Sequence, residues 1–539
     1  RRIADSMYDL PKQVVCRCMT GCIVKVLQDQ WFLNYSDLEW KEKAKKALGK
    51  MKIYPENATQ WFLTVIDWLK EWACARTTGF GTPLPWGKGW IIETLSDSTV
   101  YMAFYTINKT IKQYNIKPEQ LTREVFEYVF LGKGNVKQLA EKTKIEIKAL
   151  EEMRREFLYW YPVDLRVSAK ELVPNHLTFF IFHHTALFPP KHWPLAIGVN
   201  GMLMIEGKQM HKSKGNFVTM KKAIEEYGAD ATRCALLMAA EGMDDPDWRA
   251  ESVKDIKNKL EAFYNYAQSI IKNAKKEENG HLEKWLTSMM QHRIAEVTRN
   301  LEEMKTRTAL EIALFEVWND FRWYSRRKGK MNSKALLENL QSWVKLLAPF
   351  TPHLCEELWS QIHGKGFIST AQWPTPNETY IDLLSEEQEN LLKEVIEDTL
   401  NVLKATKMEP KKICYYVASK WKWKIYIETL KKSVHGEIRL NELMKEIAGR
   451  EDLKPRMKEA AKIVPKMAKD VAAMLPKTKQ NLLTIGEIDE KKMLTEAIDF
   501  IKERFQTEVS VYSEEDEKRY DPKQRAAMAM PGRPAIYIE

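Results

Sequence analysis

A long stretch of helical spacing, from about Asp245 to Trp373, constrains the fold of this chain more than any other feature. Its apolar residues recur at the intervals of a helix face, as at Leu301, Met304 and Ile312, and few helix breakers interrupt them. The pattern predicts several consecutive helices that bury a common apolar face, which is a helical bundle.

Prolines mark the late part and the end of this stretch. Pro349 and Pro352 are close enough together to predict a bend between two helices. Pro374, Pro376 and Asn377 follow, and a cluster of this kind is typical of a linker.

The regions on both sides of the helical stretch have a different pattern. The first 235 residues mix short β-rich runs with helices, and beyond the linker amphipathic helices alternate with β-like runs at 413–418 and 509–512. A chain of 539 residues also exceeds what one apolar core usually organises. We therefore expect an α/β region, a helical bundle and a small mixed α/β C-terminal domain, with bounds 1–240, 241–380 and 381–539.

Composition indicates a folded protein of the cytoplasm. Hydrophobic residues make up 44% of the chain and charged residues 29%, as in ordinary globular proteins. We find no apolar run long enough for a membrane span, and the first residues have no apolar signal core. Three of the seven cysteines, Cys16, Cys18 and Cys22, invite a zinc interpretation, but Cys-x-Cys is not the usual knuckle spacing. We expect no metal there and reduced thiols instead.

Positive charge is concentrated in one segment. The formal charge is 84 − 74 = +10, and residues 401–480 alone contain 20 Lys or Arg against 9 Asp or Glu, a net of +11. Within it, Lys420, Lys422 and Lys424 alternate with Trp421 and Trp423, a mixture suited to phosphate contact and base stacking. A solvated helical surface is the alternative interpretation.

The segment 196–216 carries the clearest chemistry. It is predicted to run as a strand, a polar loop and the start of a helix, and its loop contains several cations, a hydroxyl and a glycine. Ammonium groups, free backbone N–H groups and a helix dipole together suit a polyphosphate.

Residues 209–216, QMHKSKGN, closely resemble the signature KMSKSKGN of the class I aminoacyl-tRNA synthetases. The resemblance implies ATP and Mg²⁺ as cofactors and makes Lys212 the catalytic cation that stabilises the departing pyrophosphate. It also implies that Gln209, Met210, His211, Lys212 and Ser213 line the nucleotide site. Gln209 and His211 depart from the signature, where Lys and Ser are expected, so the loop has one cation fewer and its activity is expected to be impaired.

Other stretches are similar to the leucyl-tRNA synthetase family of the archaeal and eukaryotic cytosolic type. They include 28–35, 74–86, 164–177, 323–327, 347–359 and 513–539. The resemblance implies that Asn175 and His176 line the active site, with Ala169 in place of an expected Gly, and that Arg326, Arg327 and Arg533 contact tRNA. Leucine and tRNA(Leu) are then the implied partners, and residues 1–240 are part of a Rossmann-type catalytic domain.

The resemblance does not cover a whole synthetase. The His-x-Gly-His motif of class I enzymes is absent from the printed sequence, and 1–240 resemble only the part that follows the editing domain. We expect an N-terminal half to come from elsewhere, and we expect the chain to charge no tRNA alone. An inactive tRNA-binding relative of the family is the main alternative, and an isoleucyl or valyl enzyme is a third.

Overall fold

The computed structural model describes residues 14–16, 20–23, 30–210, 215–273, 280–329, 334–362 and 364–539. Contacts divide the chain into two compact units. The first contains residues 1–217 and 239–248, and the second contains 218–238 and 249–539. The helices at 218–238 thus belong with the second unit, and 241–380 and 381–539 are not separated, so the three predicted domain bounds stay a prediction.

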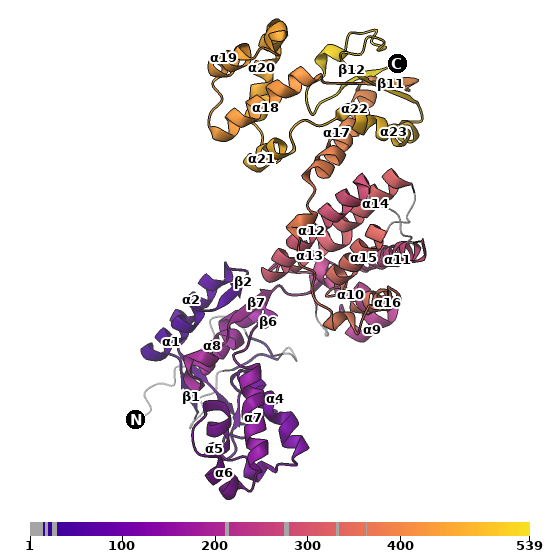
Figure 1. The fold of residues 1–539 in the computed structure, drawn as a ribbon. Coiled ribbons are helices and arrows are strands. Elements are labelled where there is room, and N and C mark those ends of the chain that lie inside the picture. Colours follow the sequence, from indigo (N-terminus) through magenta and orange to yellow (C-terminus); the bar gives the residue numbers. More distant parts are fainter. Residues whose placement is uncertain are drawn as a thin grey trace. The chain divides into compact units, whose positions relative to one another are not determined.

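A small parallel sheet forms the centre of the first unit, with strand order β2-β7-β6 (Figure 1). In β7, Ile197 and Val199 on one face and Ala196 and Gly198 on the other are all buried, as expected for the central strand of a parallel sheet that is covered on both faces. Helix α8 contributes Phe179, Phe180 and Phe182 to the same core, all fully buried. This sheet confirms the predicted α/β region.

Short elements complete the first unit. Two antiparallel pairs, β1-β3 and β4-β5, precede a group of helices, and a three-stranded sheet of order β10-β8-β9 follows β7. The bounds are β1 Phe32–Asn34, α1 Leu38–Leu48, β2 Lys52–Tyr54, α2 Ala58–Trp68, β3 Glu71–Ala73, β4 Ala75–Arg76, β5 Ile91–Ile92, α3 Thr94–Asp97, α4 Tyr101–Gln113, α5 Arg123–Phe126, α6 Val136–Thr143, α7 Ile147–Trp160, β6 Arg166–Ala169, α8 Thr178–Leu187, β7 Ala196–Asn200, β8 Met204–Ile205, β9 Lys208–Gln209 and β10 Asp247–Trp248.

The second unit begins as a helical bundle, as predicted. Helix α15 ends at Leu347 and α16 begins at Pro352, so the prolines lie at the predicted bend, and the Asp230 carboxylate accepts a hydrogen bond from the Leu354 backbone at 2.7 Å. The bounds are α9 Met220–Tyr227, α10 Ala229–Met238, α11 Ala250–Asn273, α12 His281–Glu302, α13 Thr306–Glu311, α14 Val317–Lys328, α15 Lys334–Leu347 and α16 Pro352–Gln361.

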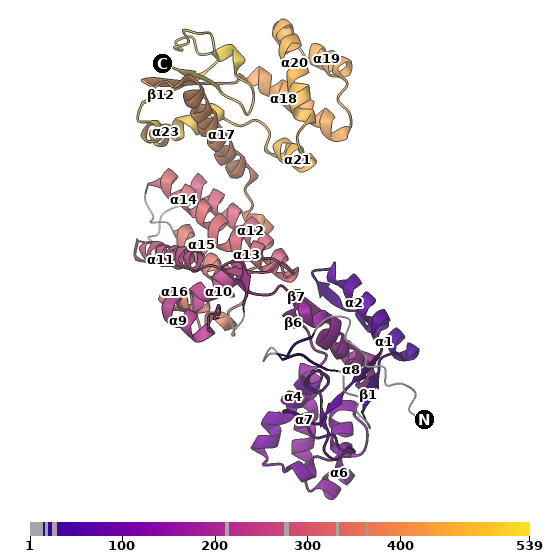
Figure 2. The ribbon, with the colours of Figure 1, turned by 180° about the vertical axis from the view of Figure 1, so that it is seen from behind.

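A further three-stranded sheet, of order β12-β11-β13, lies in the C-terminal part of the second unit (Figure 2). Strands β11 and β12 cover the predicted β-like runs and pair in parallel, and four helices inserted after β11 have a separate apolar core. The bounds are α17 Leu383–Thr406, β11 Lys412–Val417, α18 Lys420–His435, α19 Leu440–Gly449, α20 Met457–Ala472, α21 Pro476–Ile485, α22 Glu490–Glu496, α23 Ile498–Phe505, β12 Glu508–Ser513 and β13 Ala535–Ile538.

Helix α17 is held against the bundle through Glu389, which is fully buried. Its carboxylate accepts hydrogen bonds from Trp323 at 2.7 Å and from Nε and Nη2 of Arg327, each at 3.1 Å. Nε2 of His281 lies 2.9 Å from the same carboxylate. Burial alone would raise the pKa of Glu389, but the hydrogen bonds from His281 and Arg327 outweigh it and hold the pKa at about 2. The Glu389 carboxylate is therefore ionised, and it is paired with Arg327.

Candidate active site

The segment that resembles the class I signature leaves the sheet as a hairpin. Strands β8 and β9 pair antiparallel, and their turn consists of Glu206 and Gly207, both with positive φ, 49° and 74°. Positive φ at both central residues is the conformation of a type I′ turn, which suits the twist of a two-residue hairpin. The hairpin presents Gln209 and Met210, both exposed, at its end.

Two carboxylates anchor this hairpin. Strand β8 pairs in parallel with β10, whose Asp247 accepts a hydrogen bond from the Gly207 backbone at 2.9 Å. Asp245 accepts one from the Met202 backbone at 2.7 Å and pairs with Lys170 at 2.7 Å. The hydrogen bond from Lys170, followed by that from the Met202 backbone, lowers the pKa of Asp245, so the anchor is charged at neutral pH.

Three residues of the predicted nucleotide site, His211, Lys212 and Ser213, lie outside the described residues. The structure describes the signature segment on either side of them. The Asn216 side chain donates a hydrogen bond to the Gln209 carbonyl at 2.7 Å, so the two ends of the loop are held together.

Asn175 and His176 lie on the short helical turn before α8. The Asn175 side chain accepts the His176 backbone N–H at 2.6 Å, and His176 Nε2 lies 2.9 Å from the Ser98 hydroxyl. His176 is buried, and within the described part of the chain its Nδ1 has no hydrogen-bond partner. Burial, then the charge of Arg166, lowers the pKa of His176, so the ring is neutral at physiological pH.

Ala169, which stands where the resemblance leads one to expect a glycine, does not need glycine's conformational freedom. Its φ of −77° and ψ of 153° are angles that any residue adopts.

A half-buried histidine, His183, was also missed by the sequence analysis. His183 lies 3.0 Å from the Tyr35 hydroxyl through Nε2 and 2.5 Å from the Thr99 hydroxyl through Nδ1. Burial, then the nearby His176, lowers the pKa of His183 to about 4. A histidine within the largely apolar sequence of α8 is the signal that could have identified this residue. In its neutral form, the His183 ring links α8 to Tyr35 and Thr99.

The comparisons with known proteins agree on a family. Residues 23–249 match the family model of tRNA synthetases class I (I, L, M and V), and residues 283–415 match the anticodon-binding domain of tRNA ligase. The leucine–tRNA ligase of Methanothrix thermoacetophila is 41% identical over 541 residues, which cover 100% of this chain and 56% of that protein. The leucine–tRNA ligase of Pyrococcus furiosus is 42% identical over 552 residues, with 100% and 55% covered.

The chain belongs to the leucine–tRNA ligase family. It spans about half the length of the curated relatives it matches. A solved leucyl-tRNA synthetase of Agrobacterium radiobacter, in a ternary complex with tRNA and LeuAMS, is similar at 15% identity and a TM-score of 0.41 over 71% of this chain and 44% of the other. A score that low is no argument for the fold.

The residues predicted to contact tRNA in this family member are not equally accessible. Arg326 is exposed on α14, whereas the side chain of Arg327 is 7% exposed because it pairs with Glu389. Arg533 is exposed in a turn near the C-terminus. The burial of Arg327 argues against a phosphate contact there, and it gives this residue a role in holding α17.

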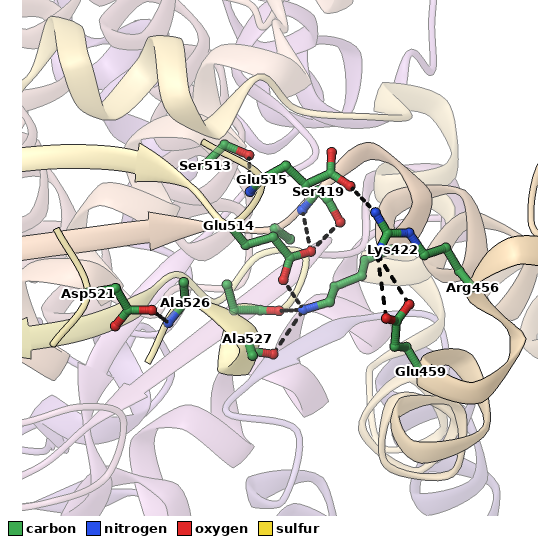
Figure 3. A network of polar contacts seen from close by, with 12 residues as sticks. Ser419, Lys422, Arg456, Glu459, Ser513, Glu514, Glu515, Asp521, Ala526 and Ala527 are labelled. Carbon is green, nitrogen blue, oxygen red and sulfur yellow. Dashed lines mark hydrogen bonds and ion pairs between the residues drawn. The ribbon is translucent and has the colours of Figure 1, made fainter. Parts of the chain in front are cut away.

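Lys422 has turned inward on α18 (Figure 3). Its side chain is 3% exposed, its ammonium pairs with Glu514, and it donates to the carbonyls of Ala527 at 3.1 Å and Ala529 at 2.7 Å. The burial argues against the predicted phosphate contact. The ammonium instead ties α18 to the C-terminal segment.

The residues next to Lys422 on α18 differ in how exposed they are. Lys420 is exposed, and Lys424 pairs with Asp452 at 2.7 Å. Trp423 is buried, and so are the aromatic side chains of β11, whereas Trp421 is half-exposed. Base stacking at Trp421 stays a prediction. The buried aromatic residues gave the same signal because a buried helix face and a stacking surface use the same residue types.

Cys16 and Cys22 flank an antiparallel bridge between Val15 and Gly21, each following one of the bridged residues. Cys16 is disulfide-bonded, which contradicts the expected reduced thiol, whereas Cys22 is free and exposed; Cys18 lies outside the described residues. Over the described ranges, no group of three or more His, Cys, Asp or Glu side chains is arranged to hold a metal ion. Among the helices described, none combines the length and apolar character needed to cross a bilayer.

Proposed function

We propose that this chain forms the signature-loop and tRNA-binding part of a leucine–tRNA ligase. In the proposed reaction the carboxylate of leucine attacks the α-phosphorus of ATP, the bond to the β-phosphate oxygen breaks, and pyrophosphate departs. A terminal hydroxyl of tRNA(Leu) then attacks the carbonyl carbon of the adenylate, and AMP leaves. An N-terminal half of the family type supplies the other wall of the nucleotide site.

The similarity to leucine–tRNA ligases along the entire chain carries this proposal. The anchored hairpin supports it, because β9 ends where the signature segment begins. Lys212 then acts as a mobile cation: negative charge grows on the β- and γ-phosphates as pyrophosphate leaves, and an ammonium near them lowers the barrier. A magnesium ion bound with ATP would supply further positive charge to the departing pyrophosphate.

The altered signature favours a second candidate. Gln209 and His211 replace a cation and a hydroxyl, and a loop with one cation fewer is what a relative that binds tRNA without charging it would tolerate. Adenylate formation separates the two candidates.

The test is leucine-dependent exchange of pyrophosphate into ATP, with the chain combined with an N-terminal half of a leucine–tRNA ligase. We expect Lys212→Ala to lower the exchange rate more than about tenfold while tRNA affinity barely changes. Lys221→Ala is the matched control, since Lys221 is an exposed lysine on α9 with only a loose ion pair to Glu225 at 3.8 Å. Equal rates for the two variants would remove Lys212 from the mechanism.

The same assay tests the departures from the signature. Gln209→Lys combined with His211→Ser is expected to raise the exchange rate, because a cation returns to the loop. A lower rate would show that the two residues are adapted to this enzyme.

A further inference from the structure

Helix α20 has two faces of opposite character. One face is the apolar core of the inserted helices, where Ala460, Val464, Met467 and Val471 are all buried. Figure 1 shows α20 beside α18 and α19, which share that core. The other face is directed to solvent, and its composition is unusual.

Four lysines line the solvent face of α20: Lys458, Lys462, Lys466 and Lys469, all exposed. At 100° per residue their directions fall within an arc of about 80°. We call these four residues the lysine stripe. Within the described ranges none of the four forms an ion pair, which matters because neutralised lysines cannot neutralise a ligand.

The acidic residues of α20 lie outside the arc. Glu459 turns toward Arg456, which also pairs with Glu515 at 3.1 Å (Figure 3). Asp470, like Glu459, lies about 20° or more beyond the edge of the stripe. On the other edge the small residues Ala461 and Pro465 leave room for a ligand to approach the helix.

Four lysines of the neighbouring segments contrast with the stripe, whereas Lys420 on α18 and Lys445 on α19 are exposed as the stripe is. Four exposed or half-exposed lysines close to α20 in sequence pair with acidic residues on the same surface: Lys424 with Asp452 at 2.7 Å, Lys431 with Glu428 at 2.9 Å, Lys432 with Glu446 at 2.5 Å and Lys454 with Glu451. The net charge of +11 in 401–480 is therefore not spread evenly over the surface. On α20, four exposed lysines form one continuous row of positive charge.

Spacing suggests the kind of ligand. Lys458, Lys462 and Lys466 are one helical turn apart, about 6 Å along the axis, and the whole stripe spans about 17 Å. Phosphates repeat along a nucleic acid strand at a comparable interval, so one row of ammonium groups can follow one strand. Exposed aromatic side chains that could stack on bases do not occur on α20. Such a surface holds a backbone without reading its sequence.

We propose that the lysine stripe of α20 binds the sugar–phosphate backbone of RNA, in place of Lys422 and Lys424 of α18, which sequence alone suggests. The choice of RNA among polyanions rests on the proposed function. The contact is sequence-independent, so the stripe adds affinity to every tRNA alike and does not select tRNA(Leu).

The experiment compares two variants of the full chain that lose the same charge. In one, Lys458, Lys462, Lys466 and Lys469 are changed to Gln; in the other, Lys424, Lys431, Lys432 and Lys454 are changed to Gln. Affinity for a transcript of tRNA(Leu) and for a transcript of an unrelated tRNA is measured over a series of salt concentrations, after circular dichroism and thermal unfolding have shown that both variants fold as the parent does.

We expect the stripe variant to bind both transcripts more weakly by more than about tenfold at low salt. The slope of log affinity against log salt should fall by about 0.7 to 0.9 for each phosphate that the variant no longer neutralises. The control variant should stay within about twofold. Equal losses of affinity in the two variants would overturn the proposal, because net charge alone would then explain binding. A loss of affinity for one transcript only would also overturn it.

The outcome is independent of catalysis. RNA binding needs neither ATP nor an N-terminal half. The affinity difference between the two variants can therefore be measured even if the chain fails in pyrophosphate exchange. Conversely, an active enzyme whose stripe variant binds tRNA like the parent refutes the stripe and leaves the proposed function intact.

Discussion

Gly201 lies where two backbone segments approach each other below the signature hairpin. A Cβ atom at this position would lie 1.9 Å from the Asp244 carbonyl oxygen and 2.4 Å from its carbon, so one backbone segment must move to accept any side chain. The same approach allows the Met202 backbone to reach Asp245 and the Gly207 backbone to reach Asp247. Only glycine fits at this position without a shift of the backbone.

We predict that Gly201→Ala loosens the hairpin. The amide protons of Met202 and Gly207 should exchange with solvent at least about tenfold faster, because their carboxylate acceptors move away. Gly49→Ala is the control in the same unit, since Gly49 has a helical φ of −66° and a Cβ there would meet nothing closer than 3.5 Å. Unchanged exchange at both amides in Gly201→Ala would contradict the account of the anchor.

Individual side chains show where sequence reasoning stops. The family resemblance predicted a phosphate contact for Arg327, and a local pattern predicted one for Lys422. Each is instead buried against an acidic partner far along the chain, Glu389 at a separation of 62 residues and Glu514 at 92. A local pattern shows that a lysine is present but not which carboxylate the fold brings to it. The stripe of α20 is visible only after the paired lysines have been set aside.

Secondary elements were more predictable, because their signals are local. Alternation of apolar residues and β propensity lie within the strand itself, and β11 and β12 appear at the predicted runs. The bend at Pro349 and Pro352 is a property of proline and was also predicted. The compact unit to which a helix belongs depends on contacts with residues far along the chain. No local sequence pattern therefore predicts that α9 and α10 belong to the second unit.

The link between α18 and the C-terminal segment makes a prediction at the level of elements. Lys422→Met leaves the charge of Glu514 buried without its cation, although the carboxylate keeps its hydrogen bonds from Ser419, and it removes two hydrogen bonds to carbonyls. It should therefore destabilise the second unit by about 3–5 kcal/mol. Lys424→Met, which removes a half-exposed pair, should cost about 0–1 kcal/mol. Urea unfolding measures both.

A double variant separates burial of charge from loss of packing. Lys422→Met combined with Glu514→Leu removes both charges, and most of the lost stability should return because no unpaired charge stays buried. If the double variant is as unstable as Lys422→Met alone, the ion pair is not the reason for the loss.

The whole chain has a signature segment on an anchored hairpin and accessible positive charge on a separate helix. It spans about half the length of its curated relatives. A doubly wound nucleotide site needs residues from both halves of its sheet. In the proposed function, the parallel sheet β2-β7-β6 is one part of such a site, and an N-terminal half supplies the other.

Charging of individually purified tRNA species tests the central claim most directly. The chain is assayed alone, and then mixed with a separately expressed N-terminal half of a leucine–tRNA ligase, with leucine, isoleucine or valine and ATP. We predict that only the mixture attaches an amino acid, that leucine is the one attached, and that tRNA(Leu) is the species that accepts it. Charging by the lone chain, or a mixture that binds tRNA(Leu) and charges nothing or charges isoleucine or valine in preference to leucine, would contradict the account.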